Sequence, residues 1–249
     1  MRKYLYFRVM KNLKLFILFI AFNLVNAQNT SEHISSYDMI SVTYKASPKW
    51  SAYAEFQLRG NERYSTFDYY EIKGGVGYNV AKKHQILLGL GRYGTYKNRS
   101  ISQEEFRLWL QYTFNQEIGK LDLDHRVRAE QRFFHASQTG ENTTANRFRY
   151  RLSLSYPLNK DNIQKGALFA NIFDEVFVGP KDNALKRNRI YSGLGYVISD
   201  NVTASSGYLW QREFSNKGNK NLHYLYFALT FKIDSSKEPK TRIKVSEVD

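Results

Sequence analysis

The sequence predicts an all-β protein, a closed antiparallel transmembrane β-barrel preceded by a cleaved signal peptide. Three observations lead to this fold class. Apolar and polar residues alternate in one segment after another, short turns alternate with longer polar loops, and aromatic residues recur at equivalent strand ends. The composition agrees, because the 249 residues include 19 Tyr and 17 Phe but only 4 Pro, and aromatic residues favour strands.

The N-terminus has the features of a secretory signal peptide. Basic residues precede the apolar run LFILFIAFNLV at 15–25, and small residues at Val25 and Ala27 fit cleavage after Ala27. This run is too short to cross a bilayer, which takes about 20 residues. Met10 is an alternative start, because the segment from Met10 onward is itself a sufficient signal. Removal of residues 1–27 takes away five basic residues, so the mature net charge is +14 − 5 = +9.

An exported, basic chain favours anionic lipid, polysaccharide or phosphate as a partner, and we expect no nucleic-acid partner. The absence of Cys excludes disulfides and a lipid-modified cysteine. We expect a short N-terminal segment at 28–36, the barrel at 37–233 and a polar periplasmic tail at 234–249. The expected location is the bacterial outer membrane, with outer-membrane lipid, lipopolysaccharide and the barrel-assembly machinery as partners.

Alternation with a period of two defines the strands in chain order. In the first half it marks ISVTYK at 40–45, WSAYAEFQLRG at 50–60, YEIKGGVGY at 70–78 and EFRLWLQYTF at 105–114. The segment HQILLGLGRYGTY at 84–96 is apolar on both faces and fits a strand only by its context.

The second half continues the same alternation. Its strands are LDHRVRAEQRF at 123–133, RFRYRLSLSYPL at 147–158, ALFANIFDEVFV at 167–178, RIYSGLGYVI at 189–198, VTASSGYLWQR at 202–212 and HYLYFALTFKI at 223–233. The segments amount to about eleven strands. Bacterial single-chain barrels have even numbers, so we expect twelve, with the extra strand from about residues 29–38 or from a split of one of these segments, and ten as the alternative.

The connections fall into two alternating sets, which is typical of an outer-membrane barrel. The tight set is Ser47–Lys49, Asn79–Lys83, Glu117–Lys120 and Ser199–Asn201, with 157–166 as a longer exception. The long polar set is 60–66, 97–103, 135–146, 179–186 and 215–221.

The strands that run toward the tight turns each end their apolar face on an aromatic residue. These residues are Tyr44, Tyr78, Phe114, Tyr156, Tyr196 and Phe231, and we predict that they form one interfacial girdle. Tyr70, Phe106 and Phe148 lie eight residues earlier on three of these strands. That spacing rises roughly 20 Å along a tilted strand, close to the height of the apolar band.

The opposite face of the strands then lines the lumen, where charges have to pair or be wetted. We predict a lumen charge network or anion-binding set of Glu105, Arg107, Arg126, Arg128, Glu130, Arg132, Arg147, Arg149, Arg151, Glu175 and Arg189. Further lumen-lining residues are Glu55, Arg59, Glu71 and Gln211. Two interpretations stay open: ion pairs that fill the lumen and hold the register, or an arginine stripe that binds or conducts a small anion.

The favoured function is a monomeric, non-enzymatic membrane protein, either structural or a narrow anion-preferring pore. A barrel of this size is filled by side chains, which argues against a general porin-like channel. The first alternative is an outer-membrane enzyme acting on lipid or lipopolysaccharide, with His223 as its base near the hydroxyls of Tyr224 and Tyr226. The second is a secreted soluble β-sandwich. The residues suggest no catalytic set, and we expect no metal and no cofactor.

The order and spacing of several motifs resemble a family of bacterial outer-membrane proteins, domain of unknown function 2490. The motifs are WSAYAEFQLR, EEFRLWLQY, HRVRAEQRF, RFRYRLSLSYPL, FDEVFV, NRIYSGLGY and HYLYFALTF, over roughly 37–233. The resemblance implies an outer-membrane β-barrel and no assigned activity. One departure is that Phe231 is followed by a polar tail, whereas many such barrels end in an aromatic residue. The junction from Val25 to Gln28 also resembles exported proteins of Bacteroidetes-type bacteria.

Overall fold

The computed structural model describes residues 34–60, 67–180, 184–216 and 218–236. The predicted signal peptide and most of the predicted tail lie outside these residues. The described residues contain eleven strands: β1 (Ile34–Lys45), β2 (Trp50–Arg59), β3 (Tyr69–Ala81), β4 (His84–Lys97), β5 (Ser100–Ile118), β6 (Leu121–Ala136), β7 (Asn142–Pro157), β8 (Leu168–Val178), β9 (Leu185–Ser199), β10 (Val202–Glu213) and β11 (Lys220–Asp234).

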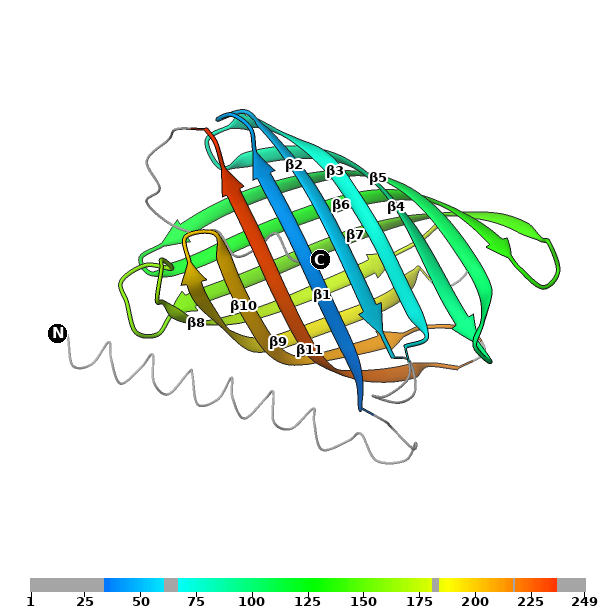
Figure 1. Ribbon diagram of the computed structural model, residues 1–249. Coiled ribbons are helices and arrows are strands. Elements are labelled where there is room, and N and C mark those ends of the chain that lie inside the picture. The colour runs from blue at the N-terminus through cyan, green and yellow to red at the C-terminus, as the bar shows by residue number, and fades with distance from the viewer. Residues whose placement is uncertain (1–33, 61–66, 181–183, 217, 237–249) are drawn as a thin grey trace. The chain divides into compact units, whose positions relative to one another are not determined.

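The strands close into one barrel, which confirms the all-β closed barrel of the prediction and excludes a two-layer sandwich. Neighbours in the chain pair in an antiparallel manner, and the closing pair, β1 with β11, is parallel along the whole of β1. Figure 1 shows β1 and β11 side by side with their arrows pointing the same way. The expected twelfth strand is wrong. Of the residues expected to form it, 29–33 lie outside the described residues, and 34–38 continue directly into 40–45 as one strand. Among the described residues, parallel pairing closes the sheet without another strand.

The parallel closure can be tested by a disulfide, because the chain has no native Cys. Ser41 and Thr230 are register partners across the seam, with their hydroxyl oxygens 3.3 Å apart. The double variant Ser41→Cys/Thr230→Cys is expected to form a disulfide on oxidation, because register partners lie within disulfide reach. The measurement is gel migration with and without reductant.

The control for this disulfide is Ser41→Cys/Thr203→Cys. Thr203 is the partner of Thr230 on β10, so it lies two strand spacings from Ser41, about 9.6 Å. This distance exceeds disulfide reach, and we expect no bond. A disulfide in the control pair together with none in the seam pair would show that the barrel closes in another way.

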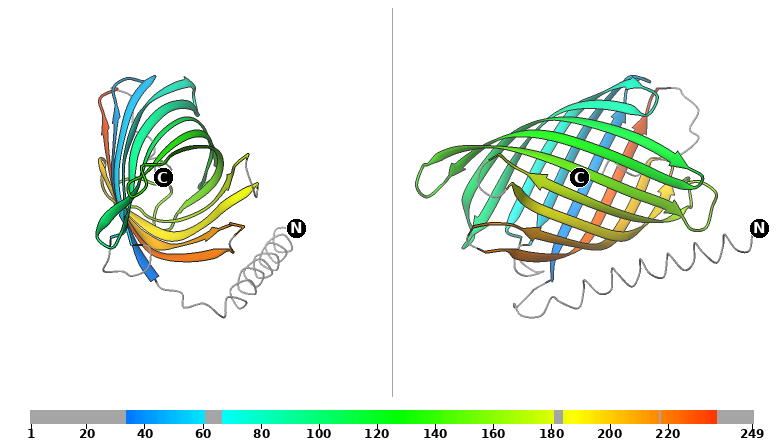
Figure 2. Two further views of the ribbon diagram at one scale, coloured as in Figure 1. Left: turned by 90° about the vertical axis from the view of Figure 1, so that its right-hand side faces the viewer. Right: turned by 180° about the vertical axis from the view of Figure 1, so that it is seen from behind.

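The connections form two rims. The turn rim holds the connections after β1, β3, β5, β7 and β9, and the loop rim holds those after β2, β4, β6, β8 and β10. The prediction of a long loop at 97–103 is wrong, because β4 and β5 are joined by Asn98 and Arg99 alone. Both residues have left-handed φ values, 51° and 63°, which is the backbone of a type I′ hairpin turn. At this rim the β6–β7 hairpin extends past β8 (Figure 2, green), because β7 begins at Asn142 but pairs with β8 only from Phe148 onward.

The pleat sends successive side chains to opposite faces, so each alternating segment has an apolar outer face and a polar inner face. Outward side chains such as Ile72, Leu88 and Leu110 are exposed, at 56%, 65% and 55%. None of the described residues forms a helix of the length and apolarity that crossing a membrane requires.

Glycine on the inner face of β4 explains why this strand lacked alternation. A Cβ atom at Gly89 would lie 2.2 Å from the ring of Trp109, so the glycine makes room for the indole. A Cβ atom at Gly91 would likewise crowd the side chains of Lys73 and Tyr93. The inner face of β4 is therefore built by side chains from its neighbours as well as by its own.

Candidate functional site

Strand register places like charges opposite each other inside the barrel. On β6 and β7, Arg126 faces Arg151, and Arg128 faces Arg149. Like charges in direct opposition destabilise a sheet unless acids lie among them. The next pair along is Glu130 with Arg147, and β8 supplies a second acid on the other side of the arginines.

Glu130 is the first of these acids. Its side chain is 0% exposed, and its oxygens lie 2.6 Å from Arg147 and 2.8 Å from Arg149. Arg107 and Arg128 approach the same carboxylate at 3.8 and 3.7 Å. Four guanidinium groups from three strands thus surround one buried carboxylate, and together they offset the cost of removing it from water.

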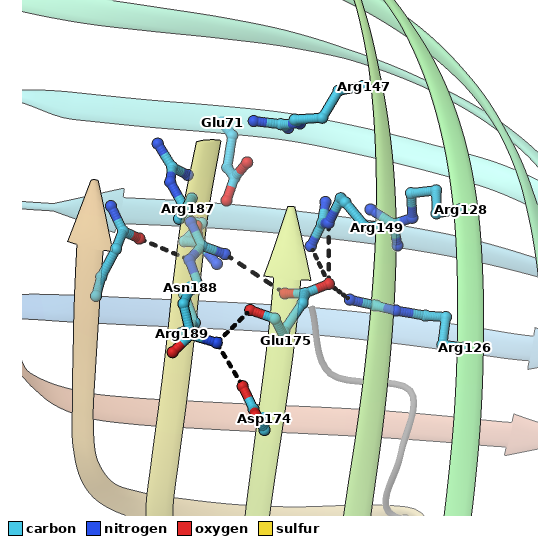
Figure 3. Close-up of polar contacts among 12 residues, drawn as sticks. Glu71, Arg126, Arg128, Arg147, Arg149, Asp174, Glu175, Arg187, Asn188 and Arg189 are labelled. Atoms are coloured by element: carbon cyan, nitrogen blue, oxygen red, sulfur yellow. Dashed lines mark hydrogen bonds and ion pairs between the residues drawn. The ribbon is translucent and has the colours of Figure 1, made fainter. Parts of the chain in front are cut away.

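Glu175 of β8 is the second acid, and Figure 3 shows it between arginines from both sides. Its Oε1 accepts hydrogen bonds from Arg126 at 2.7 Å and Arg149 at 2.9 Å. Arg189 of β9 lies 3.9 Å from Oε2. Arg149 also contacts Glu130, so its guanidinium links the two acids.

Further ion pairs and hydrogen bonds extend this cluster at both ends, so that it runs across neighbouring strands of the barrel wall. Glu105 of β5 accepts from Arg107 and, through both oxygens, from Arg132. At the other end Arg189 donates to Gln211 of β10 at 2.6 Å. We call the residues Glu105, Arg107, Arg126, Arg128, Glu130, Arg132, Arg147, Arg149, Glu175 and Arg189 the arginine network. Its seven arginines contact three carboxylates, so its net charge is 7 − 3 = +4.

Every residue of the predicted lumen set points into the barrel. All are buried except Arg132, which is half-buried. The network brings ten of the eleven together through the ion pairs above. The eleventh, Arg151, is also buried, with its guanidinium carbon 5.2 Å from the centre of the Phe173 ring.

Phe177 packs in the middle of the arginines. Its ring is fully buried, and four guanidinium carbons lie 4.6–5.2 Å from its centre, those of Arg147, Arg149, Arg187 and Arg189. A ring face attracts cations, so Phe177 stabilises arginines that have few acids to share. Sequence reasoning missed Phe177, although it lies on the same strand face as Glu175.

Aromatic side chains pack beside the arginine network inside the barrel. Tyr37, Phe173, Tyr191 and Tyr226 are buried in one apolar cluster, with ring centres of contacting pairs 5.0–5.1 Å apart. Arg189 reaches toward this cluster, 6.0 Å from the centre of Tyr37. The interior next to the network is therefore occupied by side chains from β1, β8, β9 and β11.

A smaller charged group lies on β2 and β3. Lys73, which the predicted lumen-lining set omitted, lies 2.6 Å from Glu55 and 3.6 Å from Glu71. Arg59 donates to Glu71 at 2.7 Å. A second missed pair, Arg187 with Glu213 at 2.6 Å, lies on β9 and β10. Both pairs follow the inward strand parity, which was the signal that could have found them.

The six predicted girdle residues all lie on the outer face. Tyr44, Tyr156 and Tyr196 are exposed, whereas Tyr78, Phe114 and Phe231 are half-buried. Trp50 packs beside Tyr78 with ring centres 4.8 Å apart. Phe114 lies between two histidine rings, those of His84 and His125. Whether this ring of aromatics meets a membrane interface stays a prediction.

The expected grouping of His223 with the hydroxyls of Tyr224 and Tyr226 is wrong. Both tyrosines are buried inside the barrel, whereas His223 points outward and contacts the hydroxyl of Tyr208 through Nδ1. Consecutive residues of a strand point to opposite faces, so the imidazole of His223 and the two tyrosine hydroxyls lie on opposite sides of the barrel wall. Among the described residues, no cluster of three or more His, Cys, Asp or Glu side chains could hold a metal ion.

These features define a class: a closed eleven-strand barrel with a charged, side-chain-filled interior, as far as the structure describes the chain. Residues 34–222 match the family described as "Protein of unknown function (DUF2490)", and the chain belongs to that family. No curated protein matches the sequence.

Proposed function

We propose that this protein is a non-enzymatic barrel of the bacterial outer membrane whose interior is closed by its own side chains. Its role in this proposal is structural: a stable membrane-embedded wall that does not conduct ions. The observation that carries the proposal is the burial of the arginine network, where Arg149 is 3% exposed and Glu175 is 0% exposed. Because these charged side chains are almost completely shielded from water, the interior leaves no room for a continuous aqueous path along this wall.

The outer face supports the membrane part of the proposal. Exposed apolar side chains occur on all eleven strands, among them Ile40, Leu90, Val127 and Leu194. Soluble monomers rarely expose continuous apolar patches of more than a few hundred Å². A barrel sheet has no free edge, so its backbone polar groups are satisfied within it, as a bilayer requires.

A planar bilayer tests the closed interior. The purified protein is expected to insert without producing a steady ion current, and a change in gel migration on heating verifies that the protein added to the bilayer is a folded barrel. A second candidate function, a narrow anion-preferring pore, is favoured by the +4 surplus of the arginine network. A steady anion-selective current that Arg149→Glu abolishes or reverses would establish that candidate in place of the closed barrel.

A further inference from the structure

The outer face carries a groove that the proposed function leaves unused. It has a volume of about 550 Å³ and crosses six strands, from β2 through β1, β11, β10 and β9 to β8. Its walls are almost entirely apolar and include Phe56, Ile40, Phe227, Leu194 and Tyr196. This volume lies within the range of small-molecule sites, about 300–1,000 Å³.

Residue size explains the groove. One row of register partners runs Leu168, Tyr196, Ala204, Leu229, Ile40 and Phe56 across these strands. The small side chains of Ala204 and Ser206 on β10 form its floor, while larger side chains stand on both sides. From β1 to β8 the row covers four strand spacings, roughly 19 Å, which suits an extended acyl chain.

A carboxylate also lines the groove. Asp38 of β1 is half-buried, and its register partners are Leu58 and Phe227, both apolar. Within the described residues its carboxylate has no hydrogen bond or ion pair. Asp174, also on the outer face, differs, because it accepts a hydrogen bond from Asn188 at 2.6 Å and lies outside the groove. An ionised side chain among apolar groups on a membrane-facing wall is costly unless it has a partner.

We propose that this groove binds one lipid whose head carries a primary ammonium, with the ammonium on Asp38 and an acyl chain along the row toward Leu168. An ammonium donates charge-assisted hydrogen bonds to a carboxylate, whereas an anionic head would be repelled by it. The apolar lining can bind the acyl chain of the lipid but cannot distinguish one head group from another. Asp38 therefore determines which head group is bound. The inference rests on the proposed placement in a membrane.

Native mass spectrometry of the full-length protein in detergent tests the head group. The probes are lysophosphatidylethanolamine and lysophosphatidylglycerol with the same acyl chain. We expect a preference of about tenfold for the ethanolamine lipid, which Asp38→Asn removes. The matched control Asp174→Asn should keep the preference. Equal binding of both lipids by the native protein, or a preference that survives Asp38→Asn, would overturn the proposal.

A second pair of variants tests the groove itself. Ala204→Leu fills the floor and is expected to weaken binding of both lipids several-fold. Ala129→Leu adds the same bulk to an exposed outer position of β6 and should change nothing. Equal effects of the two variants would place the lipid elsewhere. Release of the native protein from cells by high salt without detergent would instead count against the membrane placement, so the two failures are distinguishable.

Discussion

Replacing Glu175 with Gln is expected to lower the free energy of unfolding by about 3–5 kcal/mol. The substitution keeps the size of the side chain but removes the charge that Arg126, Arg149 and Arg189 share. Three guanidinium groups would then lie in the interior beside a neutral amide. The cost reflects these uncompensated buried charges, and it exceeds what the intact network contributes relative to an apolar core.

Urea unfolding in detergent micelles, followed by gel migration without heating, measures this change. The control is Asp174→Asn, one residue earlier on the same strand, where the exposed side chain faces outward and accepts only from Asn188 among the described residues. We expect the control to change the free energy of unfolding by less than about 1 kcal/mol. Similar losses in the two variants would mean that Glu175 does not hold the arginines together.

The second large effect is expected for Phe177→Ala, about 3–5 kcal/mol of lost stability. The substitution leaves a cavity in the middle of the interior and removes the ring face that four guanidinium groups contact. The same unfolding experiment measures it. Phe148→Ala is the matched control, because this ring is on the outer face and 50% exposed.

Comparing the two variants distinguishes the stability lost from interior packing from any stability lost when a phenylalanine is replaced elsewhere in the barrel. If Phe148→Ala cost as much as Phe177→Ala, the interior cavity and the lost cation–ring contacts would not be the cause. A smaller loss for Phe148 is expected, since half of its surface has no protein neighbour to lose.

Strand parity made much of the site predictable. Arg147, Arg149 and Arg151 alternate with Phe148 and Tyr150, and a period of two assigns them to opposite faces before any contact is known. The structure confirms this assignment. The ion-pair partners were harder to predict from the sequence, because the contact between Arg126 and Glu175 spans an intervening strand and depends on register.

Three errors share one cause: the local sequence pattern carries no information on how the barrel closes or on which side chains pack together inside it. Alternation indicated about eleven strands, and the expected total of twelve was wrong because an even number was assumed, whereas β1 pairs with β11 across 189 residues of sequence. Inner aromatics such as Tyr37 and Phe177 were missed because aromatic residues were assigned to the outer face. The hydroxyl neighbours expected for His223 were wrong because adjacency in sequence was taken for adjacency in space.

The parallel seam also places the two ends of the barrel at opposite rims. A strand that runs parallel to its closing partner begins at one rim and ends at the other, so β1 starts at the loop rim and β11 finishes at the turn rim. In an even-stranded barrel both ends leave from the same rim. Here a peptide tag placed before Ile34 and one placed after Asp234 would be anchored on opposite sides of any bilayer that the barrel crosses.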